Sequence, residues 1–570
     1  MRLAGSSVSG LGLTACLGLL ALGLAAPAAA QTDGDERPLP APVPIADDAL
    51  AAALETGELT EAEYVLERAR SLFQLGKVRR EYGYVVRPDG RDATLILRDL
   101  ALRADDLAGA ERTAARGILA RPDDPDPPPG QDPKVPIGDG WTAPEAIASP
   151  SCGGNVCVHW VDEVENDDAP PPEDVDPANG IPDWVDLTLV TWEDVWLGEI
   201  DTIGYRAPRT DLDSANNGGN MLLDVYLDDV GSSGVFGYCT SDDPSVGDPN
   251  VYAVSAYCVI DNDFAPEQYG DEHTPQEFLE VTSAHEFHHA SQFAYDWLED
   301  YWFMEGTATN IEETVYPAID DNVNFLELWS PLTRPASPLD RGGFGNSEYG
   351  AWIFWRFLQE KIAGEPGIVR EIWERADASV PNVSPDNYSL QAVSKELSQR
   401  GLAFRNVFAK FATANRRGDY EDAQTAGYPV PPRAAGFSLG PRNPVLRWRT
   451  WKINHLAARY LTFSPGRSAS ATARLRIEVR LPKHGTRATV LVVKTNGSVV
   501  VRRLFQNPKG YAHWKAPFGR GAVKRVEVVL TNGSTRVAAC WVYQVAPTFS
   551  CFGRPLDDGR GFRLRAQLAR

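Results

Sequence analysis

The pattern of apolar and polar positions divides the chain into a helical part, a mixed part and a β part. Residues 49–75 are rich in Ala, Leu and Glu, and their apolar side chains recur on one helical face. From about residue 140, short apolar runs predict strands at 156–161, 222–227 and 252–260. Beyond residue 446, further short runs predict strands at 460–463, 475–479, 489–493, 499–501 and 526–530. The chain is therefore predicted to fold as several domains, as expected for 570 residues.

The clearest single element is a helix predicted at about 275–296. Thr274 and Glu277 form a capping box, with Pro275 at the first helical position. The middle of this helix carries the letters His-Glu-Phe-His-His at 285–289. Any site built there would stand on rigid backbone.

The residues at 285–289 have the spacing of a metal site. His285 and His289 are four residues apart, so both imidazoles project from one face of a helix. Glu286 then stands beside the water that fills a remaining ligand position, which is the H-E-x-x-H arrangement of zinc peptidases. His288 is rotated away from this face, and we expect it to line the pocket or face water.

Other metal chemistries fit the letters less well. A metzincin needs Gly and His where this chain has Gln292 and Tyr295. A di-iron bundle needs a second Glu-x-x-His, and the chain has one. Histidines that merely cover a helix surface remain an alternative, because two ligands alone do not make a metal site.

The third ligand is predicted to be Glu305. It follows an aromatic segment at 301–303 and begins a predicted helix that runs through 311–313. A second helix packed on the first can bring its carboxylate to a metal and complete a His-His-Glu set with water as the fourth ligand. Glu312 and Glu313 are weaker candidates, better suited to a place behind the ligands or in solvent.

These letters resemble a known family. His-Glu-Phe-His-His at 285–289 with Phe-Met-Glu-Gly-Thr-Ala at 303–308 resembles the gluzincins, and more closely a group of secreted bacterial proteins classed as metalloproteases that carry H-E-F-x-H and M-E-G-T-A. The resemblance extends over much of 150–360, including 224–227 and 349–352. It implies an α+β zincin-like catalytic domain with a small sheet, an active-site helix and a helical subdomain.

The resemblance also implies roles for residues. Zinc (Zn2+) would be bound by His285, His289 and Glu305, with Glu286 as the general base. Tyr349 is the candidate donor to the oxyanion, because it precedes an aromatic helix and related enzymes use a downstream Tyr or His. A structural tyrosine at a helix start is the favoured alternative for this residue. Many gluzincins place Asp four residues after the ligand Glu to orient a zinc-binding His, whereas this chain has Thr309. The orienting group is therefore unassigned, with Glu313 as a substitute.

The implied chemistry is peptide hydrolysis. Zinc lowers the pKa of a bound water to about 7 and polarises a carbonyl, while Glu286 takes the water proton and passes it to the leaving amine. We therefore expect a secreted zinc-dependent endopeptidase that acts on protein or peptide substrates. The competing hypothesis is a secreted binding protein with an inactive site, in which the β part recognises the partner.

The predicted domains follow from changes in composition. Residues 1–30 have the basic start, apolar run and small-residue end of a secretory signal. Residues 31–120 form a helical pre-region, and a propeptide and a permanently packed extension fit it equally. Residues 121–139 are a Pro-rich linker, 140–436 the zinc metallopeptidase domain and 437–570 a basic β-sandwich with Asn-Gly turns at 496–497 and 532–533.

Cysteine usage and export support each other. Removal of the signal leaves six cysteines, which pair by proximity as Cys152 with Cys157, Cys239 with Cys258, and Cys540 with Cys551. Disulfides are natural in a secreted, extracellular protein. No later stretch is apolar for long enough to span a membrane, so no membrane span is expected once the signal is removed.

Charge is unevenly distributed along the chain. Residues 441–570 carry 25 Lys and Arg against 4 Asp and Glu, whereas residues 1–440 carry 30 against 74. Attraction between oppositely charged domains explains this pattern, and contact of the basic domain with anionic envelope polymers is the alternative. No nucleic-acid partner is expected.

Two polar segments upstream of the predicted helix suggest further sites. Asp174, Asp176, Asn179 and Asp183 surround a glycine turn in the manner of a calcium (Ca2+) loop, although one extra residue leaves an ordinary Asx-turn loop as the alternative. Residues 259–264 end a strand whose polar edge could hold an extended peptide by strand addition. For Asp261 and Asp263 themselves, a solvated turn is the favoured interpretation.

Overall fold

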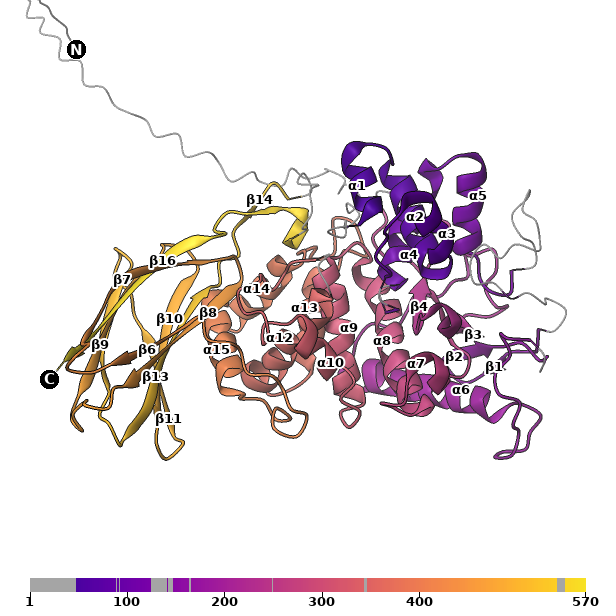
Figure 1. Cartoon of the computed structure of the whole chain (residues 1–570). Coiled ribbons are helices and arrows are strands. Elements are labelled where there is room, and N and C mark those ends of the chain that lie inside the picture. Colours follow the sequence, from indigo (N-terminus) through magenta and orange to yellow (C-terminus); the bar gives the residue numbers. More distant parts are fainter. Residues whose placement is uncertain are drawn as a thin grey trace, which may run out of the picture. The chain divides into compact units, whose positions relative to one another are not determined.

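The computed structural model describes residues 48–569 except 89, 92, 125–140, 142–146, 164–165, 249, 343–345 and 541–548. The expected signal at 1–30, the leader up to residue 47 and most of the predicted linker at 121–139 lie outside the described residues. Within them the fold is mixed α/β, with several sheets and a β-rich C-terminal part (Figure 1). None of the described helices is both long and apolar enough to cross a lipid bilayer.

The N-terminal helical region, residues 48–124, confirms the helical character expected from the sequence. Thr60 and Glu63 make the predicted capping box, and Gly57 in the left-handed conformation separates the first two helices. The elements are α1 (Ala49–Thr56), α2 (Glu61–Phe73), α3 (Leu75–Tyr82), α4 (Ala93–Ala101), the short η1 (Ala104–Asp106) and α5 (Gly109–Ile118).

The central sheet has the order β1-β2-β3-β5-β4. Its strands are β1 (Ser151–Cys152), β2 (Val156–His159), β3 (Leu223–Asp228), β4 (Gly237–Thr240) and β5 (Tyr257–Asp261). β2, β3 and β5 run parallel, whereas β4 is antiparallel to β5 and forms one edge. The prediction that residues 259–264 end an edge strand is wrong, because β5 lies between β3 and β4.

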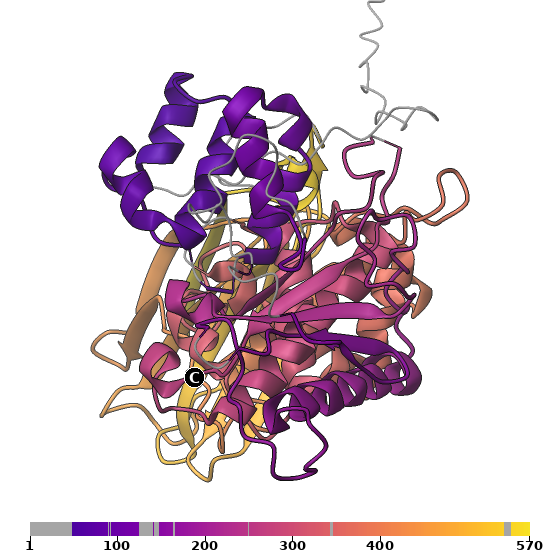
Figure 2. The same cartoon turned by 90° about the vertical axis from the view of Figure 1, so that its right-hand side faces the viewer.

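Both faces of the central sheet are covered (Figure 2). Successive side chains of a strand point to opposite faces. Val225 and Leu227 accordingly pack in a core with α6 (Asp183–Trp196) and α8 (Pro275–Asp296). Tyr226, between them, packs in a second core with the N-terminal helical region.

The helix predicted at 275–296 is confirmed as α8, with its capping box and Pro275 at the first turn. Further α-helices follow it along the chain. They are α9 (Tyr301–Val315), α10 (Val323–Leu328), α11 (Ser347–Gly350), α12 (Trp352–Phe357), α13 (Gly367–Ala376), α14 (Leu390–Gln399) and α15 (Phe404–Arg417). Shorter helical pieces are η3 (Leu197–Ile203), η4 (Val230–Ser233), α7 (Pro266–Tyr269), η5 (Leu358–Ala363) and η6 (Ser550–Phe552).

The C-terminal part consists of two sheets packed face to face, which confirms the β-sandwich. One sheet has the order β11-β10-β13-β8-β6 and the other β12-β9-β16-β7, and one apolar core joins them. The strands are β6 (Ala435–Leu439), β7 (Val445–Ile453), β8 (Ala457–Pro465), β9 (Arg474–Arg480), β10 (Thr486–Lys494), β11 (Val499–Leu504), β12 (Tyr511–Pro517), β13 (Val523–Asn532) and β16 (Arg560–Ala569), beside a small ribbon of β14 (Val537–Ala538) and β15 (Arg554–Pro555). Asn496-Gly497 lies in the tight turn between β10 and β11, as expected.

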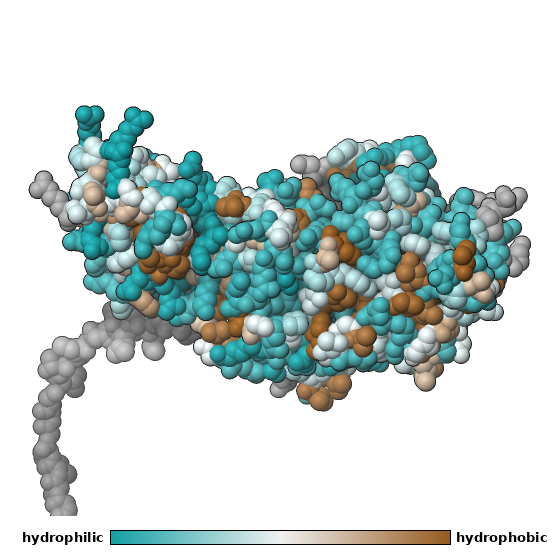
Figure 3. All heavy atoms as spheres, turned by 90° about the horizontal axis from the view of Figure 1, so that it is seen from below, coloured by the Kyte–Doolittle hydropathy of each residue, from teal (hydrophilic) through white to brown (hydrophobic). Residues whose placement is uncertain are grey.

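The three local disulfides are present as predicted: Cys152–Cys157, Cys239–Cys258 and Cys540–Cys551. The second joins the edge strand β4 to β5. Disulfides of this kind fit an oxidising compartment. On the face shown in Figure 3, apolar side chains are scattered among polar ones.

Candidate metal centre

Two packed helices bring the predicted ligands together. His285 and His289 project from α8, and Glu305 comes from the first turns of α9. The Glu305 Oε2 atom lies 3.2 Å from His285 Nε2 and 3.5 Å from His289 Nε2. One ligand atom from each residue lies within 4.8 Å of the others, and the three side chains are at most 2 % exposed.

The donor set fits a metal ion. His289 Nε2 and Glu305 Oε1 are buried and have no hydrogen-bond partner among the described residues. Buried polar atoms are almost always satisfied, so such orphans in one cluster indicate a bound group that is not part of the chain. Two imidazole nitrogens and a carboxylate oxygen are ligands that zinc takes in proteins.

The electrostatics of the three residues favour a cation. Burial opposes the ionised form of Glu305, but the charges and hydrogen bonds of the two histidines outweigh it and lower its pKa to about 2. Burial alone would lower the pKa of His285, yet hydrogen bonds to Glu305 and Glu312 raise it to about 10. The cluster therefore holds positive charge against two carboxylates, and a divalent ion can replace the proton.

The groups that orient the two histidines differ from the predicted one. Glu312 Oε1 lies 2.6 Å from His285 Nδ1, and Gln292 Oε1 lies 2.8 Å from His289 Nδ1. Glu313, the substitute predicted from the sequence, instead contacts Asn322 at 3.3 Å. Each histidine thus has its second nitrogen fixed, which leaves Nε2 free to face Glu305.

The sequence held signals for both orienting groups. Glu305 and Glu312 are seven residues apart, so they share one face of α9 after two turns, whereas Glu313 is rotated by a further residue. Gln292 follows His289 by three residues on the same helix, a spacing at which side chains are neighbours.

Glu286 is buried beside the ligands and has an unexpected partner. Its Oε2 accepts a hydrogen bond of 2.7 Å from Thr94 Oγ1, a residue of α4 in the N-terminal helical region. The sequence did not predict this contact, because Thr94 and Glu286 are 192 residues apart and no local signal links them. Glu286 is nonetheless one position from His285 on the same helix, as a base next to a metal-bound water must be.

Tyr349 lies next to the candidate site. It belongs to the short helix α11, is fully buried, and its ring stacks on that of His285 with 6.0 Å between centroids. Phe325 stacks on Tyr349 at 4.8 Å. The position of Tyr349 near His285 is compatible with a donor to the oxyanion, and that role stays a prediction.

The prediction for His288 is wrong. His288 neither lines a pocket nor faces water, because it is fully buried with its Nδ1 atom 2.7 Å from Glu199 Oε2. Burial raises the pKa of Glu199 and lowers that of His288. Burial therefore opposes charge on both side chains, and their contact joins α8 to η3.

The predicted calcium loop is built from hydrogen bonds within the loop. The Asp174 carboxylate accepts from the backbone N–H groups of Asn179 and Gly180, and Asp183 Oδ1 accepts from those of Val175 and Asp176. Among the residues that the structure describes, the only group of three or more His, Cys, Asp or Glu side chains with metal-binding spacing is His285, His289 and Glu305. The loop thus corresponds to the Asx-turn alternative, and calcium there stays a prediction.

Known proteins give no further guide to this centre. Comparison of the sequence with family models and with curated proteins returned no match.

Proposed function

We propose that the protein is a zinc-dependent endopeptidase of the gluzincin type. The observation that carries this proposal is the buried cluster of His285, His289 and Glu305 with the Glu286 carboxylate on the next residue of the same helix. Support comes from the two orphaned nitrogen and oxygen atoms of the cluster and from the fixed second nitrogen of each histidine.

Each side chain has a distinct task in this proposal. His285, His289 and Glu305 would hold zinc, which when bound would supply a water of pKa about 7 and polarise the substrate carbonyl. Glu312 and Gln292 keep the two imidazole rings oriented. Glu286 takes the proton of the attacking water on its carboxylate and gives it to the leaving amine.

The surrounding fold supports the assignment to a zincin-like domain. A mixed sheet with an antiparallel edge strand, β4, covers α8, and a helical part follows it along the chain. Zinc binding by residues on two packed helices is then precise, because neither helix can shift without disturbing a fully buried core. The oxidising compartment indicated by the disulfides fits export, as the signal at 1–30 predicts.

The test is metal content of the purified full-length chain. We expect one zinc per chain, and loss of zinc from the His289→Ala and Glu305→Ala variants. His484→Ala is the matched control, since His484 belongs to the β-sandwich and should leave zinc content unchanged. A chain that takes up no zinc at any concentration would favour the binding-protein alternative.

A further inference from the structure

One residue of the N-terminal helical region occupies the centre of the proposed active site. The Thr94 hydroxyl donates to Glu286 Oε2 at 2.7 Å and accepts from the Cys239 backbone N–H at 2.9 Å. Glu286 is the proposed base, and Cys239 lies in β4, the edge strand of the central sheet. A single hydroxyl thus engages both the proton acceptor and a backbone donor of the edge.

The edge strand β4 is the place where an extended peptide would bind. Peptidases hold substrate backbone by adding it as a strand to an exposed sheet edge. In this structure the edge is covered, because α4 packs against β4 and its Thr94 hydroxyl bonds to both Cys239 of β4 and Glu286 of α8. Leu95 of α4 belongs to the same apolar core as Ala284, Phe287 and Ala290 of α8.

The burial of the site agrees with this covering. Glu286 is 1 % exposed, and none of the three proposed ligands exceeds 2 %. Substrate must reach both the metal and Glu286 for hydrolysis, so the chain in this conformation cannot act on a protein. Either the N-terminal helical region moves, or the site does not work.

Buried arginines anchor the N-terminal helical region. Arg98 is fully buried in α4, and its guanidinium donates to the backbone oxygens of Trp297 and Glu299 just after α8. Arg91, just before α4, lies 3.6 Å from Glu312 and 2.6 Å from Asp321. Arg98 thus binds the loop that follows α8, and Arg91 contacts Glu312, the carboxylate that orients His285.

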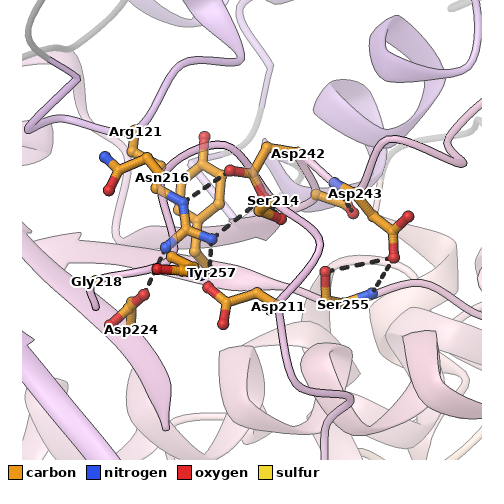
Figure 4. A network of polar contacts seen from close by, with 12 residues as sticks. Arg121, Asp211, Ser214, Asn216, Gly218, Asp224, Asp242, Asp243, Ser255 and Tyr257 are labelled. Atoms are coloured by element: carbon orange, nitrogen blue, oxygen red, sulfur yellow. Dashed lines mark hydrogen bonds and ion pairs between the residues drawn. The ribbon is translucent and has the colours of Figure 1, made fainter. Parts of the chain in front are cut away.

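The third anchor lies at the C-terminal end of the same region (Figure 4). The Arg121 guanidinium is enclosed by the carboxylates of Asp211, Asp224 and Asp242, with nitrogen–oxygen distances of 2.6, 2.5 and 2.8 Å. Tyr257 of β5 lies under it, with 4.9 Å between the guanidinium carbon and the ring centroid. The sequence expected as a Pro-rich linker begins at this residue.

We propose that the N-terminal helical region is an inhibitory segment whose helix α4 fills the groove between β4 and α8, where an extended peptide substrate would bind. The Thr94 hydroxyl is bonded to the carboxylate of the proposed base. Arg91 and Arg98 fix the segment around α4, and Arg121 fixes its C-terminal end. This proposal rests on the proposed function, because it assigns a regulator to that same site. Activation requires displacement of α4, which a cut in the sequence after Arg121 would promote.

A cut acts through effective concentration. While the chain is intact, α4 is tethered to its groove at an effective concentration on the order of millimolar, so rebinding outcompetes substrate. After a cut the segment can dissociate, and dilution then favours the open groove. The Thr94→Val change removes the hydrogen bonds to Glu286 and Cys239 with little change in side-chain volume. It therefore weakens the binding of α4 to its groove further.

The experiment uses the full-length, zinc-loaded chain with a recognition site for a sequence-specific protease placed within residues 126–139. Amide hydrogen exchange of β4 and cleavage of a fluorogenic peptide are measured before and after the cut, in wild type and in Thr94→Val. Thr113→Val is the matched control, because the hydrogen bond of the Thr113 hydroxyl within the described part of the chain stays inside α5, to the Gly109 carbonyl at 3.2 Å. We expect faster exchange of the Cys239 amide and a rise in peptide cleavage of about tenfold or more after the cut and dilution.

The outcomes separate the two proposals. Unchanged exchange and unchanged cleavage after the cut, or a loss of cleavage in Thr94→Val, would overturn the inhibitory role and make Thr94 a working part of the site. Faster exchange at β4 without any cleavage would support the covering of the groove but contradict the peptidase assignment. Thr113→Val should match wild type in both measurements.

Discussion

At the scale of single residues, periodicity on two helices specifies the proposed metal site. The spacing of His285 and His289 was enough to predict one shared face, and Glu305 followed as a carboxylate at the start of a second helix. The sequence left the orienting group of His285 unassigned and offered Glu313 as a substitute, whereas the group in contact with His285 Nδ1 is Glu312. The choice of Glu313 neglected the helical phase between Glu305 and the two candidates.

Substitution of Glu312 tests this arrangement at the bench. Glu312→Gln keeps an acceptor near His285 Nδ1 but removes its charge, so we expect zinc affinity to fall by about 10- to 100-fold. Glu313→Gln, one residue further along α9, should leave zinc affinity close to wild type. Competition with a chelator measures both, and equal losses in the two variants would contradict the assignment of Glu312.

Glu313 itself gives a prediction about pH. Burial raises its pKa from its usual range to about 7, against the opposing effect of Arg356. The folded chain therefore keeps this proton while the unfolded chain releases it, so the contribution of Glu313 to stability is present at low pH and is lost as pH rises toward 7.

Glu313→Gln should remove that loss, because an amide does not ionise. Relative to wild type, its free energy of unfolding should improve between pH 5 and pH 8 by on the order of 2 kcal/mol. Urea denaturation at the two pH values measures this difference. If the difference in free energy of unfolding between wild type and Glu313→Gln were the same at pH 5 and pH 8, Glu313 would ionise in its usual range.

At the scale of elements, local signals predicted helices well and sheet order poorly. The start of α8 was predicted to the residue, because Thr274, Pro275 and Glu277 are local signals. The position of β4 at the edge was missed, since β4 precedes β5 in sequence yet lies outside it in the sheet. Strand order depends on contacts between distant segments, which apolar periodicity does not encode.

The proposed metal site depends on the contact between α9 and α12, because this contact sets the position of Glu305 on α9. A Cβ atom at Gly306, next to Glu305, would lie 2.7 Å from the Trp355 indole nitrogen and 3.3 Å from the Glu348 carbonyl oxygen. Close approach of the two helices thus requires glycine at this position. Trp355 is fully buried and cannot move without disturbing the core.

Gly306→Ala should therefore lower both the free energy of unfolding, by about 1–3 kcal/mol, and zinc affinity, because the shift of α9 carries Glu305 with it. Gly198→Ala is the control, since its Cβ would meet Val315 at an ordinary 3.5 Å. Thermal unfolding and zinc titration of the two variants measure the effect. A Gly306→Ala chain as stable as the control would show that the helices tolerate the wider separation.

At the scale of the whole molecule, the protein joins a buried candidate metal centre to a basic β-sandwich. The few acids of that sandwich are largely paired with arginines of the same part, as Glu478 is with Arg476 and Arg565. Glu527 additionally pairs with Arg416 of α15. Ion pairs between the oppositely charged parts are thus few among the described residues.

The role of the N-terminal helical region could not be decided from sequence, because helicity alone fits a propeptide and a permanent extension equally. The proposed inhibitory role rests instead on the contacts of Thr94 and of the buried arginines. They span up to about 200 positions along the chain. Such pairings arise only from the tertiary fold.

The central claim is tested most directly by peptide cleavage in a Glu286→Gln chain that still holds one zinc, cut after Arg121 alongside wild type. The account predicts that wild type cleaves the peptide, and that Glu286→Gln retains zinc but loses cleavage by about 100- to 10,000-fold, since only the proton acceptor has been removed. Cleavage by zinc-loaded Glu286→Gln at the wild-type rate would contradict it.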